Sequence, residues 1–261
     1  MSDIDPRFEE DWNSHKQRGR AHRALTRQLD YQEEKAASLR DKERETLLDM
    51  FVRARTVRQK LEAVRPVPDD SRVLEVGSGA HGLIFGFGTE NGVGIDPLAV
   101  DYKRLFPKWQ ENASTVASIG EELPFEDAAF DIVLSDNVVD HAEAPVKIIE
   151  EISRVLRPGG LLYFTVNIHH PVYDLVSRAH GFWNSIGMRF EISAFADHTV
   201  HFTEDQVRSV FAGLPVNILA SHSNVSELKA EYRKLKARNI EQFIKKLFFK
   251  NALIEIIGTR R

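Results

Sequence analysis

A glycine-rich loop is the first feature of this sequence whose residue types and spacing could do chemistry. Gly77-Ser78-Gly79-Ala80-His81-Gly82 has the pattern GxGxxG and directly follows the β-branched run 72–76. Asp96 closes the next such run, 92–96. Glycines let a backbone approach a bound ligand closely, and an acid at this distance can accept from ribose hydroxyls. The pattern is typical of dinucleotide sites, so an NAD-dependent oxidoreductase is one hypothesis.

Glu75, two residues before the first glycine, favours a different ligand. A carboxylate here would repel the pyrophosphate that a dinucleotide places over such a loop. S-adenosylmethionine carries no phosphate, and its ammonium and sulfonium groups both favour a nearby negative charge. Asp96 suits either ligand, because both present a ribose diol to this position. Glu75 therefore predicts S-adenosylmethionine as the cofactor.

Histidines at the ends of two predicted strands are candidate general bases. His141 follows the run 130–135, and His169-His170 follows the run 161–166. Imidazole titrates near neutral pH and could take the proton of a hydroxyl acceptor. We therefore take His141, His169 and His170 as catalytic candidates, ahead of His198 and His201 further along the chain. A structural role, such as helix capping, is the alternative for each of them.

The composition excludes several kinds of site. The chain has 261 residues and no cysteine, which rules out disulfides and thiolate metal sites. The histidine spacings match no recognised ligand pattern, and Asp136 with Asp140 does not complete a carboxylate cluster, so we expect no metal. No apolar run reaches the roughly 20 residues of a membrane helix, and the first residues lack a secretory signal. We therefore expect a cytoplasmic protein.

Charge is distributed unevenly along the chain. Residues 66–224 contain ten basic residues against 22 acidic ones, whereas residues 225–261 contain ten basic residues against four acidic ones. The acidic middle argues against nucleic-acid binding. A basic helix predicted over 225–247 could contact an anionic membrane surface peripherally, or could simply be a solvated helix face.

Short β-branched runs that alternate with helical segments must position these residues. Helical apolar spacing over 146–156 ends at Arg157-Pro158-Gly159-Gly160, which predicts a helix stop followed by a turn. Thr203-Glu204-Asp205-Gln206 is a capping box that begins another helix. Alternating strands and helices predict a parallel α/β sheet, and residues 6–64 predict two or three helices ahead of it. The expected strands are 72–76, 92–96, 114–118, 130–135, 161–166, 216–220 and 252–258.

Five motifs occur in an order that resembles a known family. They are Val73-Leu74-Glu75-Val76-Gly77-Ser78-Gly79, Gly94-Ile95-Asp96-Pro97, Leu123-Pro124-Phe125 with Phe130-Asp131, His141, and Arg154-Val155-Leu156-Arg157-Pro158-Gly159-Gly160. Through them, residues 71–167 resemble the class I methyltransferases of the ubiquinone/menaquinone-methyltransferase-like (methyltransferase type 11) superfamily. The resemblance implies a doubly wound, seven-stranded, mostly parallel sheet of the Rossmann-like methyltransferase fold, with its last strand antiparallel.

The same resemblance implies roles for individual residues. Glu75 would lie near the methionine ammonium, the Gly77-Ser78-Gly79 backbone would approach the cofactor, and Asp96 with Pro97 would hold the ribose. Ser135, Asp136 and Asn137 would line the face where the methyl group is transferred. Ile119 before Gly120 departs from the family, because many relatives have an acidic residue there for the adenine amino group. Backbone groups and apolar contact would hold the adenine instead.

We divide the chain into an N-terminal helical extension, 1–66, and an S-adenosylmethionine-binding methyltransferase domain, 67–261. Residues 168–202 are expected to form a substrate-side insertion. The leading hypothesis is metal-independent O-methylation of a small molecule or glycan acceptor, including a lipid-linked saccharide. A non-catalytic cofactor-binding or partner-binding protein on the same fold is the alternative from another class, and it predicts cofactor binding without turnover.

Overall fold

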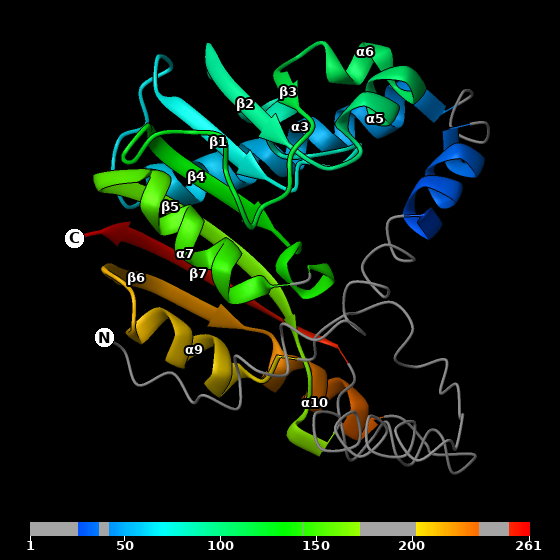
Figure 1. Ribbon diagram of the computed structural model, residues 1–261. Coiled ribbons are helices and arrows are strands. Elements are labelled where there is room, and N and C mark those ends of the chain that lie inside the picture. Colours follow the sequence, from blue (N-terminus) through cyan, green and yellow to red (C-terminus); the bar gives the residue numbers. More distant parts are fainter. Residues whose placement is uncertain (1–25, 37–41, 143, 173–201, 235–250) are drawn as a thin grey trace, which may run out of the picture.

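One seven-stranded sheet forms the centre of the molecule (Figure 1). The computed structural model describes residues 26–36, 42–142, 144–172, 202–234 and 251–261. Within these ranges the strand order is β3-β2-β1-β4-β5-β7-β6, and β7 is antiparallel to both of its neighbours. The prediction of a mostly parallel sheet is therefore confirmed. The strands are β1 (Arg72–Val76), β2 (Asn91–Ile95), β3 (Ser114–Val116), β4 (Phe130–Asp136), β5 (Leu156–Ile168), β6 (Val216–Ser223) and β7 (Ala252–Arg260).

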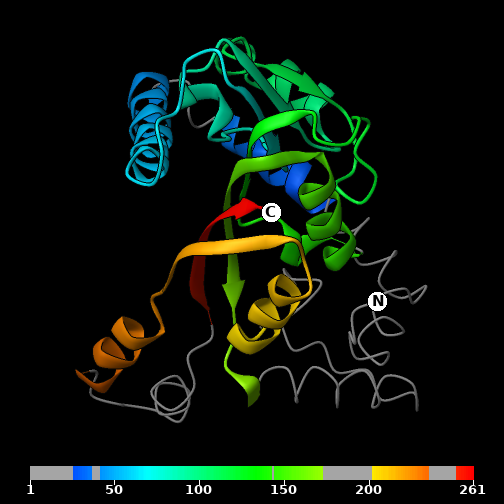
Figure 2. The same ribbon diagram turned by 90° about the vertical axis from the view of Figure 1, so that its left-hand side faces the viewer.

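Helices cover both faces of this sheet, as Figure 2 shows from the side. One face lies under α7 (Pro145–Val155) and α9 (Glu204–Ala212), and the other lies under α3 (Glu43–Glu62). Because side chains alternate along a strand, Leu74 of β1 joins the core beneath α7 and its neighbour Val73 joins the core beneath α3. Further helices are α4 (Ile84–Phe87), α5 (Ala99–Leu105), α6 (Pro107–Gln110), the 3-10 helix η2 (Val139–His141) and α10 (Val225–Lys234), and residues 26–36 are also helical.

The segment Arg157–Gly160 differs from the predicted turn. Helix α7 ends at Val155 as expected, but β5 begins at the next residue, because Leu156 already pairs with Phe130 of β4. Pairing then resumes between Ile132 and Leu161, so the extra residues bulge out of the strand. The predicted turn is instead a bulge within one strand, with Gly159 at a φ of +72°, because β5 has a partner in β4 on each side of the insertion.

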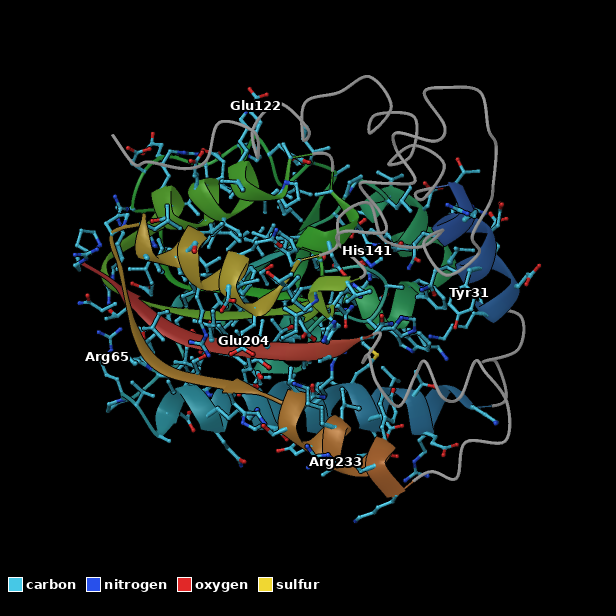
Figure 3. The ribbon with its side chains drawn as sticks, turned by 90° about the horizontal axis from the view of Figure 1, so that it is seen from below. Tyr31, Arg65, Glu122, His141, Glu204 and Arg233 are labelled. Atoms are coloured by element: carbon cyan, nitrogen blue, oxygen red, sulfur yellow. The ribbon has the colours of Figure 1, made fainter. Side chains whose placement is uncertain are left out.

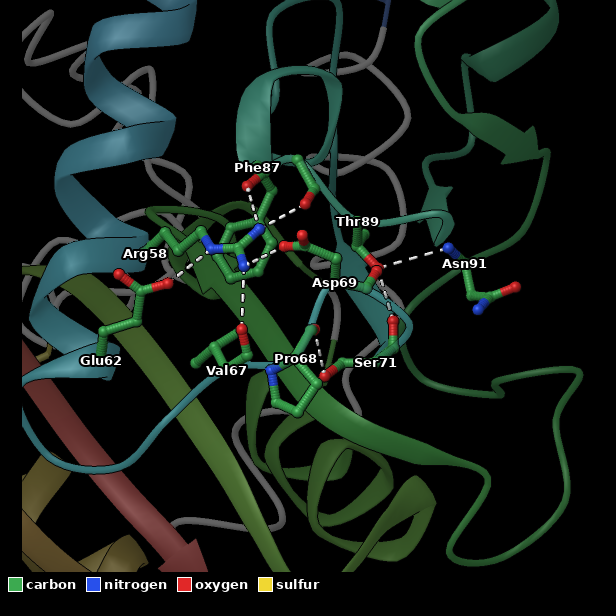
Figure 4. Close-up of polar contacts among 10 residues, drawn as sticks. Arg58, Glu62, Val67, Pro68, Asp69, Ser71, Phe87, Thr89 and Asn91 are labelled. Carbon is green, nitrogen blue, oxygen red and sulfur yellow. Dashed lines mark hydrogen bonds and ion pairs between the residues drawn. The ribbon is translucent and has the colours of Figure 1, made fainter.

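Helix α3 is attached to the sheet by apolar and polar contacts. Its buried residues Met50, Ala54, Val57 and Leu61 recur at helical spacing and belong to the same core as Val73. Arg58, only 6% exposed, donates to the Val67 carbonyl at 2.8 Å and to the carbonyls of Phe87 and Gly88 (Figure 4).

Two carboxylates complete the surroundings of Arg58. Its guanidinium also pairs with Glu62 of the same helix and with Asp69, just before β1 (Figure 4). Arg58 therefore ties α3 both to the segment that leads into β1 and to the end of α4. The division of the chain at residue 66 stays a prediction.

Some expectations concern residues outside the described ranges. Thr203 and Gln206 do form the capping box that begins α9. His198, His201, most of 168–202 and residues 235–247 of the expected basic helix lie outside the part of the chain that the structure describes.

Candidate functional site

The loops after β1, β2 and β4 meet at one edge of the sheet. Strand β1 lies between β2 and β4, all three are parallel, and their carboxyl ends therefore point to the same side. The strand order reverses at β1 and β4, which is where open α/β sheets bind their ligands. Tyr31 and His141 both lie toward this end of the molecule, and Arg65 lies at the opposite end (Figure 3).

Gly77 and Gly79 have different structural reasons to be glycine. Both have positive φ, +72° and +55° respectively. A Cβ on Gly77 would lie 2.3 Å from Val138 of the loop after β4, whereas a Cβ on Gly79 would meet nothing within 4 Å. The amides of Gly77 and Ser78 donate to the Ile95 carbonyl at 2.8 and 2.9 Å. Gly77 is thus needed for packing, and Gly79 leaves open space over the loop for a ligand.

Glu75 organises the segment that follows this loop. Its side chain is 1% exposed, and its two carboxylate oxygens accept from the amides of Leu83 (2.9 Å) and Ile84 (2.8 Å). Burial raises the pKa of Glu75 to about 8, against these two hydrogen bonds. A Cβ on Gly82 would lie 2.3 Å from the Glu75 Oε2, which explains the third glycine. Contact of Glu75 with a methionine ammonium stays a prediction.

Asp96 joins the loops after β1 and β2. One carboxylate oxygen accepts from the Gly79 amide at 3.1 Å, and the other accepts from the Leu98 amide at 2.8 Å. Burial raises the pKa of this carboxyl. Each oxygen keeps a second lone pair, which a ribose hydroxyl could use. Pro97, which directly follows Asp96, is exposed.

The end of β4 supplies polar atoms to the same edge. Asp136 accepts from the Thr165 hydroxyl at 2.7 Å. The Asn137 amide donates to the Thr165 carbonyl at 3.1 Å, and Asn137 has a φ of +59°. Ser135 Oγ and Asn137 Oδ1 are buried and have no hydrogen-bond partner in the described ranges. Buried polar atoms of this kind fit a site built for a polar ligand.

Ile119 and Gly120 lie on the loop after β3. Ile119 is 49% exposed, which is high for a large apolar side chain. Gly120 lies against Ile148 of α7, where a Cβ would come within 3.0 Å. The exposed isoleucine is compatible with apolar contact to an adenine, and that role stays a prediction.

The three candidate histidines have different surroundings. The half-exposed His141 ring has its Nε2 3.9 Å from a carboxylate oxygen of Asp140, which is fully buried and also accepts from Asn167 at 3.1 Å. His169 is 2% exposed. The Nδ1 of His170 accepts from the Val172 amide at 3.3 Å, and burial, with Lys229 nearby, lowers the pKa of His170. His141 is therefore the candidate that combines exposure with an adjacent carboxylate.

Sequence reasoning missed Arg53 and considered Asp140 only as part of a carboxylate cluster with Asp136. Arg53 of α3 donates to the His81 carbonyl at 2.9 Å and lies 3.4 Å from Asp136. Asp140 lies beneath His141. Arg53 is one of many charges on a helix, so no local pattern distinguishes it. Asp140 directly precedes His141, so the sequence could have indicated a carboxylate beside this histidine.

The described residues contain neither a candidate metal cluster nor a helix that could span a membrane. No group of three or more histidine, aspartate or glutamate side chains there could hold a metal ion. None of the helices described is both long enough and apolar enough to cross a membrane.

Known proteins resemble this chain in sequence and fold. Residues 74–164 match a family model described as a methyltransferase domain. An uncharacterized methyltransferase of Mycolicibacterium gilvum (strain PYR-GCK) is 37% identical over 100 residues, which cover 37% of this chain and 39% of that relative. The chain thus matches about two-fifths of the length of such a relative.

Solved structures extend the likeness of fold over more of the chain. A protein from Bacillus halodurans C-125 that carries a methyltransferase name has a TM-score of 0.56 at 18% identity, covering 77% of this chain and 97% of its own. Geranyl diphosphate C-methyltransferase from Streptomyces coelicolor A3(2), in complex with Mg²⁺, geranyl diphosphate and S-adenosyl-L-homocysteine, has a TM-score of 0.55 at 14% identity. That likeness covers 80% of this chain and 79% of the other.

The strand order and the match to a methyltransferase domain both argue against a dinucleotide-binding enzyme. The doubly wound dinucleotide fold has the order 3-2-1-4-5-6, whereas here the antiparallel β7 lies between β5 and β6. The oxidoreductase hypothesis is therefore wrong. Residues 74–164 match a methyltransferase domain, and the chain as a whole is similar in fold to solved methyltransferase structures.

Proposed function

We propose that this protein transfers the methyl group of S-adenosylmethionine to an oxygen of a small-molecule or glycan acceptor without a metal. The observation that carries the cofactor half of this proposal is the contact of Asp96 with Gly79, which joins the loops after β1 and β2 at the carboxyl edge of the sheet. Open space above Gly79 supports close approach of a ligand to that backbone.

The residues at this edge of the sheet suit the ribose, adenine and ammonium groups of the cofactor. Asp96 would accept from the ribose hydroxyls, and Ile119 would give apolar contact to the adenine. Glu75 would lie near the ammonium, whose positive charge would favour the ionised form of its carboxyl, and Ser135 with Asn137 offers buried polar atoms beside the transfer face. When bound, the cofactor supplies a methyl group on a positively charged sulfur, which a nucleophile can displace in line.

His141 is proposed as the general base for the acceptor. A carboxylate beside an imidazole orients the ring and stabilises its protonated form. Asp140 lies beside His141, with a carboxylate oxygen 3.9 Å from the ring Nε2, and it is fully buried. His141 would take the hydroxyl proton of the acceptor as the oxygen becomes a nucleophile, which favours O-methylation. His169 and His170 remain candidates for acceptor contact.

Calorimetry and a labelled-methyl assay test the proposal together. We expect S-adenosylmethionine and S-adenosylhomocysteine to bind and NADH not to bind. We also expect label to enter an acceptor from small-molecule or glycan pools, with no loss of rate in EDTA. Absence of cofactor binding at millimolar concentration contradicts the proposal. Binding without transfer to any pool would favour the non-catalytic alternative.

The remaining partner and location predictions need separate measurements. Helix α10 carries Arg233 and Lys234 in its last turn (Figure 3 labels Arg233), and none of its residues is fully buried, although Val225, Leu228 and Tyr232 pack against the core. Peripheral contact with anionic lipid would appear as co-sedimentation with anionic but not neutral liposomes. The expectations that nucleic acid is not a partner and that the location is cytoplasmic also stay predictions.

A further inference from the structure

Strand β6 forms one edge of the seven-stranded sheet (Figure 1). Within the described residues its only strand partner is β7. Every residue from Asn217 to His222 is exposed, so neither α9 nor α10 covers this part of the strand. The outer side of an edge strand presents a row of backbone N–H and C=O groups, which another strand can pair with. A further strand could therefore extend the sheet at β6.

The sequence of β6 lacks the features that usually protect an edge strand. Its eight residues include no proline, lysine, arginine, aspartate or glutamate. Ile218 and Leu219 are 39% and 48% exposed, and the bulge beside Leu219 leaves both of these apolar side chains at the surface. The opposite edge of the sheet differs, because β3 has only three residues and short edge strands resist pairing. Of the two edges, β6 is thus the one suited to pairing.

Opposite charges lie near the two ends of β6. Near its start, the guanidinium of the exposed Arg261 donates to the Leu214 carbonyl at 2.8 Å. Near its end, the exposed carboxylate of Glu227 lies 3.6 Å from His222. In an antiparallel pair of β6 strands, the start of each strand lies beside the end of the other. Arg261 of each copy would then approach Glu227 of the other, and this charge complementarity favours a second copy of the chain as the partner.

We propose that β6 is the interface of a homodimer, in which two copies pair antiparallel through this edge and form one continuous sheet. A two-fold axis perpendicular to the sheet relates the copies, so each strand offers the donors and acceptors that its mate needs. Ile218 and Leu219, near the middle of the strand, supply apolar contact between the copies. Because β1 and β4 lie further inside the sheet, each copy keeps its own candidate site.

The oligomeric state of the full chain tests this proposal. Sedimentation velocity at high micromolar concentration should show a dimer, and Leu219→Lys should raise its dissociation constant by about tenfold or more, because it brings two like charges together. Val100→Lys is the matched control, since it adds the same charge at an exposed apolar residue of α5 and should leave the dimer unchanged. Thermal melts should report that both variants are folded. A monomeric wild type, or a dimer that Leu219→Lys leaves intact, overturns the proposal.

Disulfide trapping tests the geometry of the dimer separately. The chain contains no cysteine, so a single cysteine placed in turn at each position from 217 to 222 reports its own contacts alone. Opposite residues of an antiparallel pair lie on the same face, so the two-fold axis makes one residue face its own copy, at a Cα separation of about 4.5–5.5 Å that permits a disulfide. Crosslinking under mild oxidation should therefore peak at one position and fall on either side. A dimer without such a peak overturns the proposal, because its copies then meet at another surface.

Discussion

Asp96 and Gly79 are joined by a hydrogen bond of 3.1 Å between the carboxylate of one strand-end loop and the backbone amide of another. The acid that is expected to bind the ribose therefore also fixes the loop over which the cofactor lies. Ligand contact and loop position are coupled through one side chain.

Replacement of Asp96 should consequently weaken cofactor binding strongly. Asp96→Ala loses both ribose contacts and the bond to Gly79, and we expect a loss of about 1.5–3 kcal/mol, typical of hydrogen bonds to charged groups. Calorimetric Kd values for S-adenosylhomocysteine give the measurement. Asp101→Ala, which removes a more exposed acid from α5, should leave the Kd unchanged. Equal affinities of Asp96→Ala and wild type would refute the role of Asp96.

The two glycines of the loop should respond differently to alanine. Gly77→Ala places a Cβ 2.3 Å from Val138 at a φ of +72°, so we expect loss of stability from both overlap and backbone strain. Gly79→Ala adds only the strain, about 1–2 kcal/mol, because its Cβ meets no protein atom. That Cβ would occupy ligand space, so Gly79→Ala should fold and bind cofactor poorly. Urea unfolding and calorimetry together distinguish the two, and normal affinity in a folded Gly79→Ala would contradict the ligand role.

The buried Glu75 carboxyl should make stability depend on pH. Its pKa is about 4.5 when unfolded and about 8 when folded, so between these values the folded state binds more protons. The free energy of unfolding should then fall as pH rises from about 5 to 8. Glu75→Gln removes this titration, and its melting temperature should gain on that of wild type as the pH rises. A variant at the exposed Glu90 should follow wild type, and parallel curves for Glu75→Gln would argue against a raised pKa.

Loss of Arg58 should destabilise the attachment of α3. Arg58→Ala leaves the carbonyls of Val67, Phe87 and Gly88 without this donor, and we expect a loss of about 2–4 kcal/mol in the free energy of unfolding. Arg58→Lys should recover only part, because an ammonium cannot reach so many acceptors at once. Urea midpoints provide the comparison, with Arg55→Ala as the charge-matched control. A change under 0.5 kcal/mol, the usual range for a surface site, would contradict the structural role.

The sheet was largely predictable because its strands carry strong local signals. Runs such as 130–135 contain several apolar and β-branched residues and begin or end at turn residues. Both signals indicate a strand. At Arg157–Gly160 the proline and glycines predicted a turn between elements. Gly159 does have a φ of +72°, but the flanking pairs of β4 and β5 make the segment a bulge within one strand. A local pattern cannot reveal strand pairing.

The candidate site was predictable where a residue belongs to a motif and hidden where it comes from elsewhere in the chain. Glu75, Gly79 and Asp96 follow predicted strands, and the parallel order brings them together. Arg53 and Arg58 come from a helix whose many charges resemble an ordinary solvated surface. Only tertiary packing distinguishes Arg58, which is 6% exposed, from its exposed neighbours.

Strand β7 has a consequence for any shortened form of the protein. Among the described strands, β6 pairs with β7 alone, and β7 connects it to β5 through eight residue pairs from Leu161↔Thr259 to Ile168↔Ala252. Deletion of residues 252–261 would therefore remove β7 and also leave β6 without its strand partner. It would expose the backbone edge of β5 that β7 covers. The matched segment 74–164 thus omits the strand that covers one side of β5, which comes from residues nearly a hundred positions further along the polypeptide.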